Sequence, residues 1–196
     1  KALRTRWKIS APSASIASSV AVAGGACKPS MISAAAAPSE SGVAAGAGFC
    51  LALACDLRVA CESTFVTTAY RNVGFSGDYG GSGLLNALVG PETTKELYFT
   101  GRRVQANEAL SLGIFNTVVP DNELTATVAA LAKHIANGPA VALGYMKENI
   151  NRASQSGLRE CLALEADRLV RCASTPDHRE AVSAFIEKRP PVFNKP

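Results

Sequence analysis

The most informative stretch of the chain is a run of small residues that leads directly into an apolar segment. Residues 44–48 read Ala-Ala-Gly-Ala-Gly, and residues 49–55 are apolar up to the charged residue Asp56. Small residues let a backbone approach a ligand closely, and the apolar run is typical of a buried helix. A helix N-terminus presents unpaired N–H groups and a positive dipole end. Residues 44–48 are therefore predicted to stabilise an oxyanion with backbone N–H groups.

Other reactive side chains do not form a recognisable catalytic set. His134 and His178 are the only histidines, and no Cys/His cluster has the spacing of zinc ligands. Ser76 and Ser82 lack a paired histidine, which argues against a triad hydrolase. The Gly-rich segment 77–82 lacks the Gly-Lys-Ser/Thr ending of a phosphate loop. These motifs therefore give no support to a zinc enzyme, a triad hydrolase or a P-loop protein.

Composition indicates a globular chain whose cysteines are expected to be reduced thiols. The chain has 196 residues, of which 47% are hydrophobic and 18% charged, and its net charge is only +4. This dispersed charge predicts no nucleic-acid partner, and no apolar run is long enough to predict a membrane span. The six cysteines form no CxxC pair. Cys50 and Cys55 are predicted to be small buried apolar residues, and a reducing compartment is the expected location.

Strand-like segments alternate with helical ones in the first part of the chain, and helices alone fill the second part. This order predicts an α/β fold with a helical C-terminal region. Gly90-Pro91 separates two helices, and Asp121 or Asn122 is placed to cap a later one. The predicted strands cover residues 57–60, 64–68 and 116–119. After a buried helix that follows residue 46, the predicted helices cover residues 82–89, 92–99, 106–112, 123–136, 141–153, 158–173 and 176–187.

Several short motifs occur in a specific order and spacing between residue 42 and the C-terminus. Beside the stretch 44–58, they are Gly-Phe-Ser-Gly-Asp-Tyr-Gly-Gly-Ser at 74–82, Leu-Val-Gly at 88–90, Glu-Leu-Tyr-Phe-Thr-Gly-Arg-Arg at 96–103, Ala-Asn-Glu-Ala-Leu at 106–110, Gly-Ile-Phe-Asn at 113–116, Val-Val-Pro at 118–120 and Phe-Ile-Glu-Lys-Arg-Pro-Pro at 185–191. Each motif alone is weak. Together they resemble the crotonase superfamily, which contains the enoyl-CoA hydratases and isomerases.

The resemblance implies a crotonase-like ββα spiral core with a C-terminal helical trimerisation region, assembled as a homotrimer or a dimer of trimers (a hexamer). Residues 42–136 are expected to form a partial spiral core and residues 137–196 the helical region. Residues 1–41 match the family poorly and have the Arg- and Ser-rich, acid-poor composition of an organelle transit peptide. The cytoplasm is the expected location, with the mitochondrial matrix as the alternative.

The resemblance also implies an acyl-CoA substrate, with coenzyme A as part of that substrate and no separate cofactor or metal. Two backbone N–H groups hold the thioester oxygen in this family, and one of them aligns with Ala47. For the other donor the nearest candidate is Ala-Gly-Gly-Ala at 23–26, which lacks the Asp-Leu that follows it in the family. The other residues predicted to bind substrate are Ala45, Gly46, Gly48, Gly80, Gly81 and Lys188.

The acid/base residues of the family are only partly present. Hydratases of the family use two glutamates, which align here with Cys50 and Tyr70, and a thiol or a phenol is a weak base at neutral pH. Several isomerases of the family place a catalytic acid in the Gly-rich loop, where this chain has Asp78. Asp78 is therefore the predicted proton carrier, with a turn-forming role as the alternative. Tyr70 is expected to line the acyl site, to donate a hydrogen bond, or to be a core aromatic residue.

The function predicted from this resemblance is acyl-CoA processing in fatty acid metabolism, by an enzyme of the lyase or isomerase class. Isomerase-type proton transfer through Asp78 is favoured over hydration by two glutamates. Two alternatives stay open. One is a non-catalytic paralogue that binds CoA or serves in assembly, and the other is a CoA-thioester hydrolase.

Overall fold

The computed structural model describes residues 18–22, 30–35 and 43–194. Beyond the two N-terminal strands, the described residues form two compact units, one built around residues 43–124 and the other around residues 125–194. The domain limits expected from sequence, at residues 41 and 136, stay a prediction, and the candidate donor segment 23–26 lies outside the described residues.

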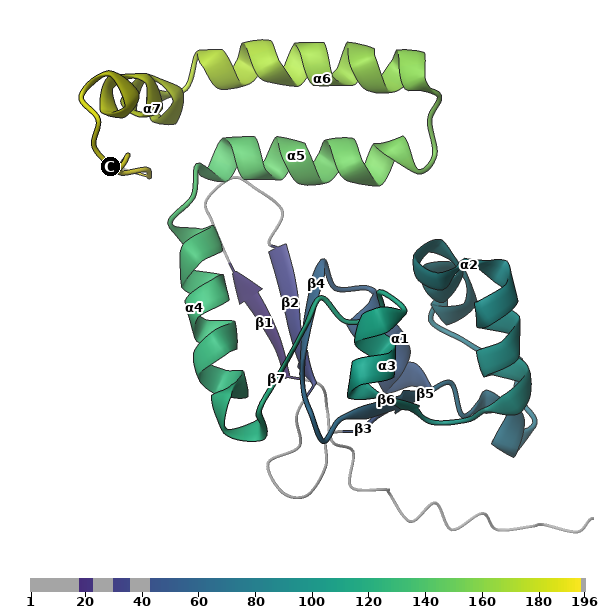
Figure 1. The fold of residues 1–196 in the computed structure, drawn as a ribbon. Helices are drawn as coiled ribbons and strands as arrows, with labels where there is room; N and C mark the ends of the chain where they lie inside the picture. The colour runs from purple at the N-terminus through teal and green to yellow at the C-terminus, as the bar shows by residue number, and fades with distance from the viewer. Residues whose placement is uncertain (1–17, 23–29, 36–42, 195–196) are drawn as a thin grey trace, which may run out of the picture. The chain divides into compact units, whose positions relative to one another are not determined.

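Two small sheets, three α-helices and two 3₁₀-helices make up the described residues of the chain up to Glu123 (Figure 1). One sheet has the strand order β1-β2-β4-β7 and the other β3-β5-β6. Val43 of β3 pairs in parallel with Phe65 of β5, and Val59 of β4 pairs in parallel with Thr117 of β7. The elements are β1 (Ser18–Val22), β2 (Ser30–Ala35), β3 (Val43–Ala45), α1 (Ala47–Leu53), β4 (Leu57–Cys61), β5 (Phe65–Thr67), η1 (Tyr70–Val73), α2 (Gly81–Thr100), β6 (Val104–Gln105), α3 (Ala106–Ser111), β7 (Thr117–Val119) and η2 (Asp121–Glu123).

The first unit has one apolar core, in which α1 is central. Phe49 and Leu53 of α1 are buried against Val66 of β5 and the helix residues Leu85 and Leu97. The buried Arg58 fixes the turn that follows α1, because its guanidinium donates to the carbonyl oxygens of Cys55, at 2.7 Å, and Ile114, at 2.5 Å. These contacts hold α1 rigidly, so its N-terminus has a defined position.

Helix α2 contains the break that the sequence predicts. Gly90 has a φ of 77° and a ψ of 170°, which are not helical, and Pro91 follows it. Proline lacks the N–H that a continuous helix would require, and glycine adopts the positive φ without steric cost. The Thr94 hydroxyl donates to the Gly90 carbonyl oxygen at 2.7 Å, which gives this oxygen a partner where the helical hydrogen bonds are interrupted. The two predicted helices therefore exist and are joined through one non-helical residue.

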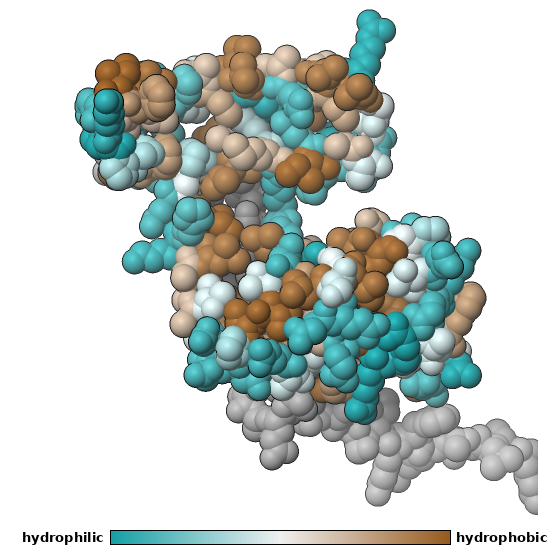
Figure 2. Space-filling view, viewed as in Figure 1, coloured by the Kyte–Doolittle hydropathy of each residue, from teal (hydrophilic) through white to brown (hydrophobic). Residues whose placement is uncertain are grey.

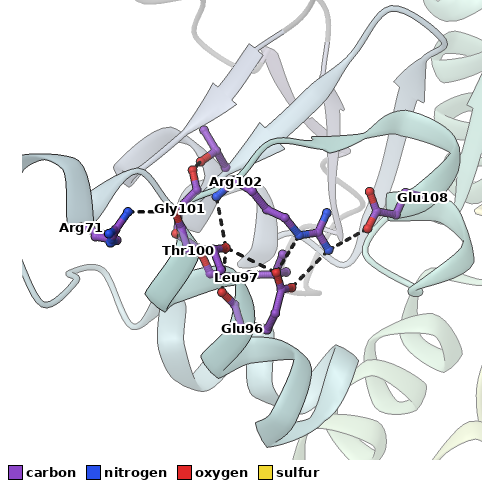
Figure 3. Close-up of polar contacts among 9 residues, drawn as sticks. Arg71, Glu96, Leu97, Thr100, Gly101, Arg102 and Glu108 are labelled. Atoms are coloured by element: carbon purple, nitrogen blue, oxygen red, sulfur yellow. Dashed lines mark hydrogen bonds and ion pairs between the residues drawn. The ribbon is translucent and has the colours of Figure 1, made fainter.

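An arginine joins the C-terminal end of α2 to α3 (Figure 3). Arg102 Nε donates to Glu96 Oε1 at 2.7 Å, and Arg102 Nη2 lies 2.7 Å from Glu108 Oε1. These side chains are about 40% exposed, so each ion pair contributes on the order of 1 kcal/mol or less. The pairs fix the turn at Gly101, which also accepts a hydrogen bond from the Thr67 hydroxyl at 3.0 Å.

Four helices form the second unit: α4 (Leu124–Ala136), α5 (Ala140–Ala153), α6 (Leu158–Ala173) and α7 (Pro176–Ile186). Helices α5 and α6 pack side by side (Figure 1), and Arg168 of α6 lies over the Tyr145 ring of α5 at 4.8 Å. Figure 2 shows hydrophobic residues on the surface of these helices. They include Leu162, Leu169 and Val170 of α6. The expected homotrimer or dimer of trimers stays a prediction.

The helices predicted from sequence are confirmed, with ends that differ by only a few residues. Asp121, one of the two residues predicted to cap the helix that begins near residue 123, has another role. The Asp121 carboxylate lies in η2 and accepts a hydrogen bond from the Ser63 N–H at 3.2 Å, so it joins two loops. His134 is exposed. In the part of the chain that the structure describes, no helix is both long and apolar enough to cross a bilayer.

Candidate active site

The N-terminus of α1 is formed by a turn that only glycine adopts easily. Gly46 connects β3 to α1 with a φ of 51° and a ψ of −124°, and its N–H donates to the Thr67 carbonyl of β5 at 3.1 Å. A side chain at residue 46 would be strained at this φ. The turn sets the direction in which the next N–H groups point, so Gly46 fixes the start of the helix.

Ala47 is the first residue of α1, as the sequence predicts. Its N–H has no hydrogen-bond acceptor among the residues described by the structure, and neither has that of Gly48. Both residues are only partly buried, while Ala45 is exposed. Unpaired N–H groups at the start of a helix are suited to hold a negatively charged oxygen. The geometry therefore agrees with the predicted oxyanion role of Ala47, which stays a prediction.

A chain of hydrogen bonds joins three side chains beside this helix. The Tyr70 hydroxyl donates to Asp78 Oδ1 and also contacts the Cys50 Sγ, 3.2 Å away. Cys50 lies on α1, Tyr70 begins η1, and Asp78 lies in the Gly-rich loop that precedes α2. Tyr70 and Cys50 are buried and Asp78 is exposed. Asp78 Oδ2 has no hydrogen-bond partner within the described residues, so one carboxylate oxygen is held and the other is available.

Tight packing holds the Tyr70 ring. It stacks on Tyr98 of α2 with ring centroids 6.0 Å apart and an interplanar angle of 17°. A Cβ built on Gly46 would lie 4.0 Å from Tyr70 Cε1, and one on Gly77 would lie 3.2 Å from Tyr98 Cε1. The turn before Ala47 therefore lies near the same phenol that holds Asp78. This arrangement places the predicted oxyanion donor and the predicted proton carrier near one side chain.

Burial and charge keep the thiol and the phenols protonated. Burial raises the pKa of the Cys50 thiol, and the Asp78 charge adds to this. Burial also raises the pKa of Tyr70 well above its ordinary value, and the hydrogen bond that Tyr70 donates to Asp78 raises it further. Burial, and after it the neighbouring Cys50 and Asp78, raise the pKa of Tyr98 to about 12. Asp78 is consequently the member of this cluster that is suited to accept a proton at neutral pH.

These raised pKa values predict that stability falls at alkaline pH. The folded phenols keep their protons at pH values where the unfolded chain has lost them, so they contribute stability that is fully present below pH 10. The free energy of unfolding is expected to fall as the pH rises from 10.0 to about 12. Tyr70→Phe and Tyr98→Phe should each flatten this fall. Urea unfolding of the variants between pH 8 and pH 12 measures the slopes.

The control for this experiment is Tyr79→Phe, which removes a phenol that is 65% exposed. A fall in stability of equal slope in Tyr70→Phe and the unmodified chain would contradict the prediction for Tyr70. The result would show that the Tyr70 phenol loses its proton at the same pH in the folded and the unfolded chain.

The remaining predicted residues are found in two places. Gly80 precedes α2 with a φ of 70°, and Gly81 is the buried first residue of α2, beside Cys50 and Tyr98. Lys188 is exposed after the end of α7, in the second unit. Sequence reasoning missed the role of two residues. Cys50 is buried, as predicted for a small apolar residue, but its thiol also makes a hydrogen bond. Tyr98, which stacks on Tyr70, lies within the motif at residues 96–103, for which no role is predicted.

Comparison with known proteins tests the family. The model of the enoyl-CoA hydratase/isomerase family matches residues 31–196. The chain belongs to this family. A short-chain-enoyl-CoA hydratase of Clostridium acetobutylicum is 36% identical over 149 residues, which are 76% of this chain and 57% of the hydratase. A 1,2-epoxyphenylacetyl-CoA isomerase of Escherichia coli is 38% identical over 153 residues, which are 78% of this chain and 58% of the isomerase.

Solved structures confirm the predicted crotonase fold. An enoyl-CoA hydratase from Bacillus anthracis superposes with a TM-score of 0.75 at 35% identity, over 78% of this chain and 59% of the hydratase. An enoyl-CoA hydratase from Geobacillus kaustophilus gives the same TM-score at 36% identity, over 78% of this chain and 59% of that protein. The chain thus spans less than two thirds of the length of these members of the enoyl-CoA hydratase/isomerase family.

Proposed function

We propose that the chain is an acyl-CoA-processing enzyme that isomerises enoyl-CoA thioesters by proton transfer through Asp78. The observation that carries the proposal is the Asp78 carboxylate, which is fixed at Oδ1 by Tyr70 and available at Oδ2. The two positions at which a hydratase of the family has glutamates hold a thiol and a phenol. Both have raised pKa values, so neither is a base at neutral pH. This favours isomerisation over hydration.

The proposed reaction moves one proton from one carbon of the substrate to another and adds no water or other group. Asp78 Oδ2 removes a proton from C2 of a 3-enoyl-CoA, and the electrons of that C–H bond form an enolate whose negative charge lies on the thioester oxygen. The Ala47 N–H donates to this oxygen, and one such donor contributes about 3 kcal/mol in the transition state. The Asp78 carboxylic acid then returns the proton to C4, and the double bond moves between C2 and C3.

Coenzyme A enters this proposal as part of the substrate. The small residues Ala45, Gly46, Gly48 and Gly80 are proposed to leave space for the thioester, and Lys188 is proposed to meet CoA phosphates. Gly81, also predicted to bind substrate, instead leaves space for Cys50 Sγ and Tyr98 Oη. A homotrimer or a dimer of trimers remains the proposed assembly. The named relatives are bacterial proteins, which supports the cytoplasm over the mitochondrial matrix as the expected location.

Product analysis tests the proposal directly. The purified chain is incubated with 3-hexenoyl-CoA and, separately, with 2-hexenoyl-CoA, and the products are identified by NMR and mass spectrometry. We expect 2-hexenoyl-CoA to form from the 3-enoyl substrate without uptake of water. Formation of 3-hydroxyacyl-CoA would indicate hydration, and release of free CoA would indicate a thioester hydrolase. Binding of the substrates without turnover would support the non-catalytic paralogue.

A further inference from the structure

One part of the cluster has no role in the proposed reaction. The Cys50 thiol is buried, and within the described residues it makes no hydrogen bond to Asp78 or to a carbonyl oxygen. Its partner is the Tyr70 hydroxyl, which in turn is bonded to Asp78. The hydrogen-bonding capacity of these three groups determines the direction of both bonds.

An ionised carboxylate only accepts hydrogen bonds, so Tyr70 must donate its single proton to Asp78. The phenol oxygen then has only lone pairs left for its second contact. The Cys50 thiol must therefore donate its S–H to the Tyr70 oxygen across the 3.2 Å contact. The chain runs in one direction, from thiol to phenol to carboxylate.

We propose that Cys50 is a positioning residue for proton transfer at Asp78 and acts through the Tyr70 hydroxyl. The inference rests on the proposed function of Asp78. A phenol hydrogen lies close to the ring plane and has two favoured orientations. The thiol occupies the lone-pair side of the Tyr70 oxygen, which directs the hydrogen towards Asp78. Asp78 is thus held at Oδ1, which leaves Oδ2 available to a substrate.

The packing around Tyr70 leaves rotation of the hydroxyl hydrogen as the main motion of this side chain. Stacking on Tyr98 and the approach of Gly46 and Gly77 fix the ring itself. Hydrogen bonds in such a chain polarise one another, so the thiol also strengthens the bond from Tyr70 to Asp78. Cys55 offers a contrast on the same segment. Its thiol is equally buried but donates to the Leu51 carbonyl at 3.5 Å and touches no site residue.

The test compares Cys50→Ala, Cys50→Ser and the matched control Cys55→Ala. Isomerisation of 3-hexenoyl-CoA gives kcat and KM for each variant of the full chain. Cys50→Ala should lower kcat by about 3- to 10-fold, which is the effect of one neutral hydrogen bond, and leave KM within about twofold. Cys50→Ser keeps a donor and should restore kcat to within about threefold of the unmodified chain. Cys55→Ala should leave both constants unchanged.

A second readout does not depend on activity. NMR of Tyr labelled with ¹³C at Cζ, recorded at neutral pH, reports on the hydrogen bonds of the Tyr70 oxygen. The Tyr70 Cζ shift should move in Cys50→Ala, because the phenol oxygen then loses the S–H donor. It should move less in Cys50→Ser, which again donates to the phenol oxygen, and should stay in place in Cys55→Ala.

The outcomes separate the two proposals. Full activity of Asp78→Asn would overturn the proposed function, and the positioning role with it. An inactive Asp78→Asn together with an unchanged kcat in Cys50→Ala would overturn the positioning role alone. Equal losses of kcat in Cys50→Ala and Cys50→Ser would also overturn it, because they would trace the effect to packing. An unmoved Tyr70 Cζ shift in Cys50→Ala would overturn the link between thiol and phenol.

Discussion

Asp78→Asn is expected to lower kcat for isomerisation of 3-hexenoyl-CoA by about 10²- to 10⁴-fold, which is the usual contribution of a general acid or base. Asn has nearly the same shape as Asp, and its amide oxygen still accepts the hydrogen bond that Tyr70 donates to Oδ1. The loop geometry should therefore persist while the ability to accept a proton is lost. KM should change by less than about threefold, because the substrate contacts are kept.

Two measurements show that the loss is chemical. Glu92→Gln removes a carboxylate from an exposed position on α2, outside the site, and should leave kcat unchanged. Deuterium exchange from D₂O into C2 of the substrate should stop in Asp78→Asn and continue in Glu92→Gln. If Asp78→Asn kept kcat within threefold of the unmodified chain, Asp78 would not carry the proton, and the proposed mechanism would fail.

Local sequence signals predict the α-helices, the strands β4, β5 and β7, and the family, but not the strands β1, β2, β3 and β6. Gly90-Pro91 marks the break inside α2, because one residue permits a positive φ and the other removes an N–H. The small residues before α1 likewise predict the turn at Gly46. Such signals work because the cause and the structure lie within the same few residues.

The connections within the candidate site lie across the sequence and were not predictable. Cys50 and Tyr70 are 20 residues apart, and only the folded chain brings their thiol and hydroxyl together. Asp121 shows the same limit, because its partner Ser63 lies 58 residues away and replaces the local cap that the sequence suggests. The type of a residue determines which hydrogen bonds its side chain can form, and the tertiary structure determines which of these bonds are present.

Gly81→Ala is expected to destabilise the chain by about 1 to 3 kcal/mol, the usual cost of an added methyl group in a well-packed core. A Cβ at residue 81 would overlap Cys50 Sγ and would lie 2.9 Å from Tyr98 Oη and 3.4 Å from Cys50 Cβ. The thiol must then turn away and lose its bond to Tyr70. Chemical unfolding of the variant measures the change, and kcat should fall with it.

Gly83→Ala is the matched control. Gly83 lies two residues further along α2, is exposed, and has no atom within 4 Å of its Cβ position. Alanine is the better helix former, by up to about 1 kcal/mol, so this variant should be as stable as the unmodified chain or more stable. Opposite signs for the two changes would locate the effect in the contact between α1 and α2, since both replace glycine by alanine on one helix.

The double variant Gly81→Ala/Cys50→Ala identifies the atom responsible. Removal of Sγ clears the overlapping contact but leaves Cys50 Cβ and Tyr98 Oη near the new methyl group. The free energy of unfolding should therefore recover in part, with a coupling between the two sites of about 0.5 to 3 kcal/mol. If the losses of stability of the two single variants simply add, the new methyl group must clash with an atom other than Cys50 Sγ. A recovery of stability without a recovery of kcat is expected, because the double variant regains its packing but still lacks the thiol that orients the Tyr70 hydroxyl.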